Sequence, residues 1–227
     1  MNTAYLFDID GTLLKIKNRA NRRIIQSILD RFGISAHNVA ELDFAGKTDR
    51  AIFSTLLDDP PEPLFNEIKD IYLQELDNHL SEEDIHMLDG VSESLDYLSG
   101  QSAATGLLTG NFEIAARIKL DRIGLNSHFL FGAFGDRHHD RNDLPPAARK
   151  NLQEQFSGDY PPEQLVIIGD TPRDIRCAHH FGSVAVAVAT GAFSRDELAR
   201  YHPHALLSSL EEFPEWDQAF FTSNEGG

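Results

Sequence analysis

The stretch "YLFDIDGTLL", residues 5–14, decides the fold, because it joins a buried strand to a pair of carboxylates. Tyr5, Leu6 and Phe7 are residues typical of buried strands. Asp8 and Asp10 follow at once, and a buried carboxylate without a partner is costly. The strand end and Gly11 allow the chain to curl so that both carboxylates face one cavity. The pair predicts a bound cation or catalysis, although an isolated D-x-D-G-T segment equally fits an Asx-turn or a helix cap.

Further apolar runs along the chain also end in small or polar residues, and they span residues 103–109, 130–134, 164–169 and 183–189. Such runs are typical of strands that are buried on both faces of a parallel sheet. Helical spacing of apolar residues separates the later runs, at 112–123 and 147–156. Since strands and helices alternate, we predict an α/β fold with a doubly wound, Rossmann-like parallel sheet.

Residues 17–88 break this alternation, because they show helical spacing and no strand-like run. The segment "DDPPEP" (58–63) is expected to separate two helices, since proline cannot continue a helix. "LDGVSESLDYLS" (88–99) is expected to form a loop and a helix that lead back to the sheet. We therefore predict a helical domain over 17–88, inserted into a core domain that residues 1–16 and 89–227 form.

The composition of the chain disfavours binding to nucleic acids or membranes and a disulfide-rich fold. The chain has 227 residues, 41% of them hydrophobic, and a formal net charge of -16, which opposes binding to nucleic acids or anionic membranes. Its one cysteine, Cys177, excludes an internal disulfide framework. No apolar stretch approaches the roughly 20 residues of a membrane span, and no leader precedes the first strand. We expect a cytoplasmic protein that acts on a small molecule.

Two reactive roles fit the aspartates of the first motif. Asp8, nearer the strand, is the candidate nucleophile toward phosphorus, and Asp10 is the candidate acid and base for the leaving group and for water. In "LLTGN" (107–111), Thr109 ends a strand before a helix, whose free N–H groups are suited to phosphate oxygens. Alternatively, Thr109 or Asn111 only caps that helix.

The segment "IIGDTPRDI" (167–175) adds Asp170 at another strand end. Thr171 and Asp174 have the spacing of a capping box. If the two strands are parallel neighbours, Asp8 and Asp170 converge outside their carboxyl ends, where α/β proteins bind ligands. Mg²⁺ prefers a few carboxylates plus water and phosphate. We expect Asp8, the main-chain oxygen of Asp10 and Asp170 to bind it, with Asp174 behind them.

In this order, the motifs resemble those of the haloacid dehalogenase superfamily over essentially the whole chain. The resemblance implies a Rossmann-like core, a helical cap over residues 17–88, and a basic residue in a third motif. That motif is commonly Lys followed by Pro, which this sequence lacks. "HDRNDLPPAARKNL" (139–152) has Arg141 just before a helix, and we select it, with Arg149 and Lys150 as rivals.

The cap carries a second resemblance. "FAGKTDRAIF" (44–53) is similar to the substrate-facing segment of phosphoglycolate phosphatase-like caps, and it equally fits an ordinary capped helix. The resemblance implies that Lys47 and Thr48 bind substrate, together with Gly110 and Asn111 of the second motif.

The activity implied is that of a phosphoric monoester hydrolase. It would use Mg²⁺ and an aspartyl-phosphate to hydrolyse a small phosphorylated metabolite, either phosphoglycolate-like or a sugar phosphate. The D-x-D form favours phosphate esters over organic halides, because an alkoxide leaving group needs a proton and a halide does not. A phosphomutase of the same fold and a non-catalytic protein that binds a phosphate ligand are the alternatives.

Overall fold

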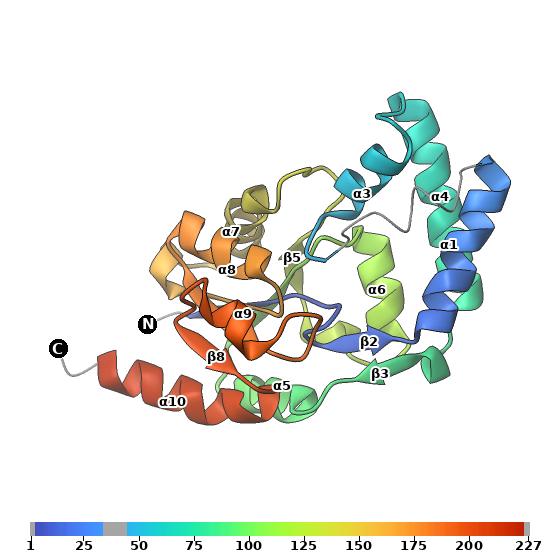
Figure 1. The fold of residues 1–227 in the computed structure, drawn as a ribbon. Helices are drawn as coiled ribbons and strands as arrows, with labels where there is room; N and C mark the ends of the chain where they lie inside the picture. The colour runs from blue at the N-terminus through green and yellow to red at the C-terminus, as the bar shows by residue number, and fades with distance from the viewer. Residues whose placement is uncertain (1–2, 34–44, 225–227) are drawn as a thin grey trace.

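The computed structural model describes residues 3–33 and 45–224, and it contains a parallel six-stranded sheet (Figure 1). The strand order is β5-β4-β1-β6-β7-β8. The bounds are β1 (Ala4–Phe7), β4 (Ala104–Leu108), β5 (Phe131–Ala133), β6 (Leu165–Gly169), β7 (Val184–Val188) and β8 (Ala205–Leu207). This confirms the predicted α/β fold, and the first five of these strands match the apolar runs.

Helices cover both faces of the sheet, because neighbouring strand residues point to opposite sides. Phe7 packs in one apolar cluster with α5 (Val91–Gly100), α6 (Glu113–Asp121) and α10 (Phe213–Asn224). Leu6 packs in the other with α7 (Leu144–Gln155), α8 (Pro172–Phe181) and α9 (Arg195–Ala199). Among the described residues, no helix combines the length and the apolarity that crossing a bilayer requires.

Three more helices stand beyond one end of the sheet, namely α1 (Asn18–Phe32), α3 (Asp49–Leu56) and α4 (Glu62–His79) (Figure 1). The chain enters this helical unit through β2 (Leu14–Ile16) and leaves it through β3 (Ile85–Met87), and the two strands pair antiparallel. The prediction of no strand within 17–88 is therefore wrong at β3. β3 has one buried residue of three, and neither β3 nor β8 lies in a five-residue apolar run like the one (130–134) that marks the equally short β5.

Strand register brings three polar residues to one edge of the sheet. Phe7 pairs with Leu107 of β4 on one side and with Ile168 of β6 on the other. Asp8 follows Phe7 directly, and Thr109 and Asp170 come two residues after Leu107 and Ile168, where β4 and β6 end. The predicted convergence of Asp8 and Asp170 thus follows from two parallel neighbours of β1.

Candidate active site

Three buried carboxylates meet at this edge. Oxygens of Asp8, Asp170 and Asp174 lie within 4.8 Å of one another, and each residue is at most 5% exposed. Asp170 packs against Gly11, where φ is +87° and an added Cβ would lie 2.4 Å from Asp170 Oδ2. Only glycine fits this turn without strain. The curl expected from the D-x-D-G-T segment therefore also makes room for the second aspartate.

Asp174 lies in the first turn of α8, in the predicted capping box. The Thr171 hydroxyl and backbone N–H both donate to Asp174 Oδ2, at 2.7 and 3.0 Å. Its other oxygen, Oδ1, accepts from Arg141 Nη2 at 2.5 Å. Asp174 is thereby held from two sides while its carboxylate stays close to those of Asp8 and Asp170.

Arg141 lies in a 3₁₀ turn directly before α7 and is 5% exposed. Its Nη2 atom is 3.2 Å from Asp8 Oδ1 as well as bonded to Asp174. Nε has no hydrogen-bond partner among the described residues, which leaves one buried donor. The structure thus brings Arg141 to Asp8. The rivals Arg149 and Lys150 lie on α7 and pair with Asp159 and Glu154 instead.

The carboxylates carry more negative charge than this one guanidinium balances. Burial raises the pKa of Asp8 to about 6; Arg141 opposes that rise, while Asp174 and Asp10 add to it. Burial raises the pKa of Asp170 to about 8, and the neighbouring Asp174 and Asp8 add to the rise. A divalent cation among these oxygens would remove the repulsion.

Asp10 has hydrogen-bond partners of its own, which differ from those of the three buried carboxylates. Its Oδ2 atom accepts from Lys119 Nζ at 2.6 Å and from Asn111 Nδ2 at 2.8 Å. Asn111 Nδ2 also donates to the Thr109 hydroxyl at 2.9 Å. The Asp10 side chain is 45% exposed, so one of its oxygens is held while the carboxylate still reaches open space.

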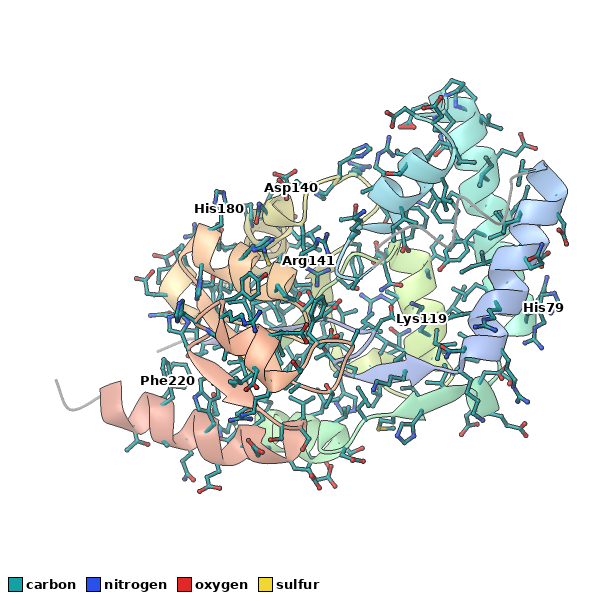
Figure 2. The ribbon with its side chains drawn as sticks, in the orientation of Figure 1. His79, Lys119, Asp140, Arg141, His180 and Phe220 are labelled. Carbon is teal, nitrogen blue, oxygen red and sulfur yellow. The ribbon has the colours of Figure 1, made fainter. Side chains whose placement is uncertain are left out.

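That space is a cavity of about 550 Å³ between the sheet edge and the helical unit. Asp8, Asp10, Asp170, Asn111 and Arg141 line its polar end, and side chains of α1, α3 and α4 line the rest. Figure 2 shows Arg141 close to the sheet edge, and Lys119 on α6 on the side of α1 and α4. Thr109 is fully buried and stands behind Asn111.

The segment before α3 joins the helical unit to the sheet edge. Gly46 O accepts from Arg141 Nη1 at 3.4 Å, and a Cβ on Gly110 would lie 2.2 Å from Lys47 O. Lys47 lines the cavity. Thr48 is buried as the N-cap of α3, where its hydroxyl accepts from Ala51 N and donates to His139 O. Both predicted residues therefore lie at the junction, and Thr48 has a capping role there.

Comparison with known proteins agrees with this arrangement. The family model of haloacid dehalogenase-like hydrolases matches residues 5–188. The chain belongs to this family. The first, second and fourth motifs quoted from the sequence lie within the matched residues, as does Arg141, and the family predicted from them is confirmed.

Several relatives of this haloacid dehalogenase-like hydrolase are named phosphatases. A phosphoglycolate phosphatase of Nitrosococcus oceani is 23% identical over 91% of this chain and 92% of its own length. One of Chromobacterium violaceum is 26% identical over 83% and 85%. CbbY from Rhodobacter sphaeroides, solved in complex with phosphate, has a TM-score of 0.74 at 21% identity, over 94% of this chain and 96% of that one. The expected class, a phosphatase of this family, is confirmed.

Lys119 of this haloacid dehalogenase-like hydrolase is 5% exposed and was not among the predicted site residues. Its ammonium bonds Asn111 Oδ1 at 2.6 Å as well as Asp10. The signal was present, because Lys119 falls on the buried face of α6 with Ala115 and Ala116. A lysine at an apolar position of a helix indicates a buried anion.

The start of α6 also departs from expectation. Neither Thr109 nor Asn111 caps it; Asp49 Oδ2 accepts from Phe112 N at 2.8 Å, and Asp136 Oδ2 accepts from Glu113 N at 2.7 Å. The N–H groups expected to be free for phosphate are thus occupied at these two residues. Asp49 belongs to α3, so the helical unit itself caps a helix of the core. Burial raises the pKa of Asp49 to about 6, against the opposing Lys119 and Phe112 N–H.

Proposed function

We propose that this protein is a Mg²⁺-dependent phosphatase that hydrolyses a small phosphate monoester through an aspartyl-phosphate on Asp8. The observation that carries the proposal is the convergence of Asp8, Asp170 and Asp174 on the polar end of one cavity, beside Arg141. Asp10 lines the same cavity, and unlike the three buried aspartates its carboxylate is partly exposed and accepts hydrogen bonds from Lys119 and Asn111.

The donor set fits a hard divalent cation. Oxygens of three buried carboxylates stand within 4.8 Å of one another. Burial raises the pKa of Asp8 and of Asp170, and the neighbouring carboxylates add to both rises. Asp8 and Asp170 would hold Mg²⁺ with the main-chain oxygen of Asp10, and Asp174 would orient Arg141. When bound, the ion would offset the negative charge of the phosphoryl group.

In the first half of the reaction, an Asp8 oxygen attacks phosphorus and the bond from phosphorus to the ester oxygen breaks. Asp10 gives its proton to that departing oxygen, so the alcohol leaves neutral. Arg141, Lys47 and the main chain of Gly110 and Asn111 bind the phosphoryl oxygens. Thr109 positions Asn111, and through it Asp10.

In the second half, water attacks the phosphorus of the aspartyl-phosphate, and Asp10, now a carboxylate, takes the proton of that water. The bond from phosphorus to Asp8 breaks, which returns both aspartates to their starting states and releases inorganic phosphate. Lys119 holds one oxygen of Asp10 throughout and leaves the other to move the proton.

Phosphate release from a panel of phosphomonoesters, including phosphoglycolate, tests the proposal. We expect release with Mg²⁺ and none with a chelator. Asp8→Asn should abolish both turnover and a phosphoenzyme trapped by rapid quench, because an amide is not a nucleophile here. The matched control is Asp159→Asn, since the Asp159 side chain is 82% exposed and is not among the described residues of the cavity wall. Retention of a tenth of the activity by purified Asp8→Asn would contradict the nucleophilic role.

A further inference from the structure

The cavity is polar at one end, and its remaining wall is mostly apolar, with Asn21 of α1 and Asp49 of α3 as polar members. The carboxylates and Arg141 occupy the end at the sheet, while α1, α3 and α4 contribute isoleucine, leucine, phenylalanine and tyrosine side chains. Its volume of about 550 Å³ is that of a site for a drug-sized molecule. Phosphoglycolate, a two-carbon ester, would fill only a small part of it.

We infer that the substrate is a phosphate monoester of an apolar alcohol, with a hydrocarbon group of several carbons that fills the part of the cavity under α1, α3 and α4. This rests on the proposed function, because it takes the phosphate end to be the reaction site. It also separates this chain from its named relatives, since phosphoglycolate carries a second charged group where this chain has an apolar wall.

Three wall residues carry the inference. Ile25 of α1 and Ile52 and Leu56 of α3 line the cavity and are partly exposed, and they do not pack with the described hydrophobic clusters. Ile52 and Leu56 are at i and i+4, so they share one face of α3. Apolar surface left facing a cavity is stabilised by an apolar ligand group.

The aromatic part of the wall continues this surface toward the reaction site. The ring of Phe53 lies 5.2 Å from that of Tyr72 and 5.8 Å from that of Phe112, centroid to centroid. Phe53 and Tyr72 line the cavity themselves. A hydrocarbon group bound to a phosphate oxygen would therefore have both rings and the aliphatic side chains of α3 to contact.

Of the cations among the described residues of the cavity wall, two are already paired, and none lies on α1, α3 or α4. Arg141 is paired with Asp8 and Asp174, and Lys119 is paired with Asp10. The main chain of Lys47 lies against Gly110, at the polar end. Lys15, also at the lining, is an exposed residue of β2. A substrate carboxylate among α3 side chains would lose its water without gaining a partner.

A homologous series of substrates tests this. Ethyl, butyl, hexyl and octyl phosphate have alcohols of nearly equal acidity, so the chemistry is constant while the hydrocarbon lengthens. We expect kcat/KM to rise about fourfold per added methylene until the cavity is full, the value of burying one methylene. A matched ester that ends in a carboxylate in place of the terminal methyl group should fall well below its alkyl counterpart.

A pair of variants tests whether the cavity wall at Leu56 is what favours the longer alkyl phosphates. Leu56→Gln, with a side chain of similar size, should lower kcat/KM for hexyl phosphate by about tenfold and leave ethyl phosphate unchanged. Leu64→Gln is the control, because Leu64 lies on the same helical unit, is 39% exposed and is not among the described residues of the cavity wall. It should change neither substrate.

The outcomes separate the two proposals. If phosphoglycolate is hydrolysed and kcat/KM stays flat or falls along the alkyl series, the inference of an apolar alcohol is overturned and the phosphatase stands. If Leu56→Gln affects ethyl and hexyl phosphate equally, the wall does not recognise the hydrocarbon, and the inference is likewise overturned. If the folded protein with Mg²⁺ hydrolyses no phosphate ester at all, the proposed function fails.

Discussion

Removing the positive charge of Arg141 should destabilise the protein and make it depend on Mg²⁺. Among the described residues, Arg141 is the one cation in ion-pair contact with Asp8 and Asp174, at 3.2 and 2.5 Å. All three side chains are at most 7% exposed. Breaking a buried ion pair by removing one partner costs about 3 to 5 kcal/mol, because the remaining charge stays buried.

For a chain of this size, that loss corresponds to a fall in the melting temperature of about 6 to 20 °C in a chelator. Arg141→Met keeps most of the side-chain volume while it removes the charge. Mg²⁺ at about 100 times the Kd of the wild type should stabilise the wild type by about 2.7 kcal/mol. At the same Mg²⁺ concentration the variant should gain more, because its carboxylates are less neutralised and bind the cation more tightly.

Thermal unfolding in chelator and in Mg²⁺, at matched ionic strength, measures both effects. Arg149→Met is the matched control, since that residue pairs with the 82% exposed Asp159 and should lose less than about 1 kcal/mol. Arg141→Lys should fall between the wild type and Arg141→Met. If Arg141→Met melts no lower than Arg149→Met, or gains no more from Mg²⁺ than the wild type, the charge balance argued for this site is wrong.

Three further predictions address proton transfer and stability. Asp10→Asn should slow phosphoenzyme formation from an alkyl phosphate by about 10²- to 10⁴-fold. With p-nitrophenyl phosphate, the same variant should give a burst of p-nitrophenolate and then a slow steady state. If the rate of phosphoenzyme formation falls equally for both substrates, Asp10 is not the acid. Lys119→Met should lower kcat by about 10- to 100-fold because Asp10 loses its orientation, so an unchanged kcat would remove Lys119 from that role. Asp217 is buried and accepts from Tyr5 and Tyr97; burial raises its pKa, against the opposing tyrosine hydrogen bonds. Its ionisation therefore lowers the free energy of unfolding as pH rises above about 4. Between about pH 4 and 7, denaturant unfolding should show the wild type losing stability relative to Asp217→Asn. A difference in the free energy of unfolding that does not change with pH would contradict this.

The buried strands were predictable because each ends its apolar run in a polar or small residue, and parallel register then requires Asp8 and Asp170 to meet. The short strands β3 and β8 were not predicted, since neither lies in an apolar run of five residues like the one (130–134) that marked the equally short β5. Lys119 was missed because a lone lysine is usually solvated, and only its position on the buried face of α6 distinguishes it.

The wall of the cavity could not be predicted for a different reason. Ile52 and Leu56 have the helical spacing of core residues, and spacing alone does not distinguish a face packed on protein from one that faces a cavity. The contact of Asp49 with Phe112 N depends on how two distant segments dock, which no local pattern encodes.

The antiparallel pair of β2 and β3 has a consequence for how new specificities arise. Both passages of the chain between the helical unit and the sheet run through this one small pair, and the strands that carry Asp8, Thr109 and Asp170 lie outside it. Substitutions in α1 and α3 can therefore reshape the cavity wall with the catalytic strands unchanged. In evolution or in the laboratory, the shape of the cavity could therefore change by substitution in these two helices, provided that contacts with the core such as that of Asp49 with Phe112 N are kept.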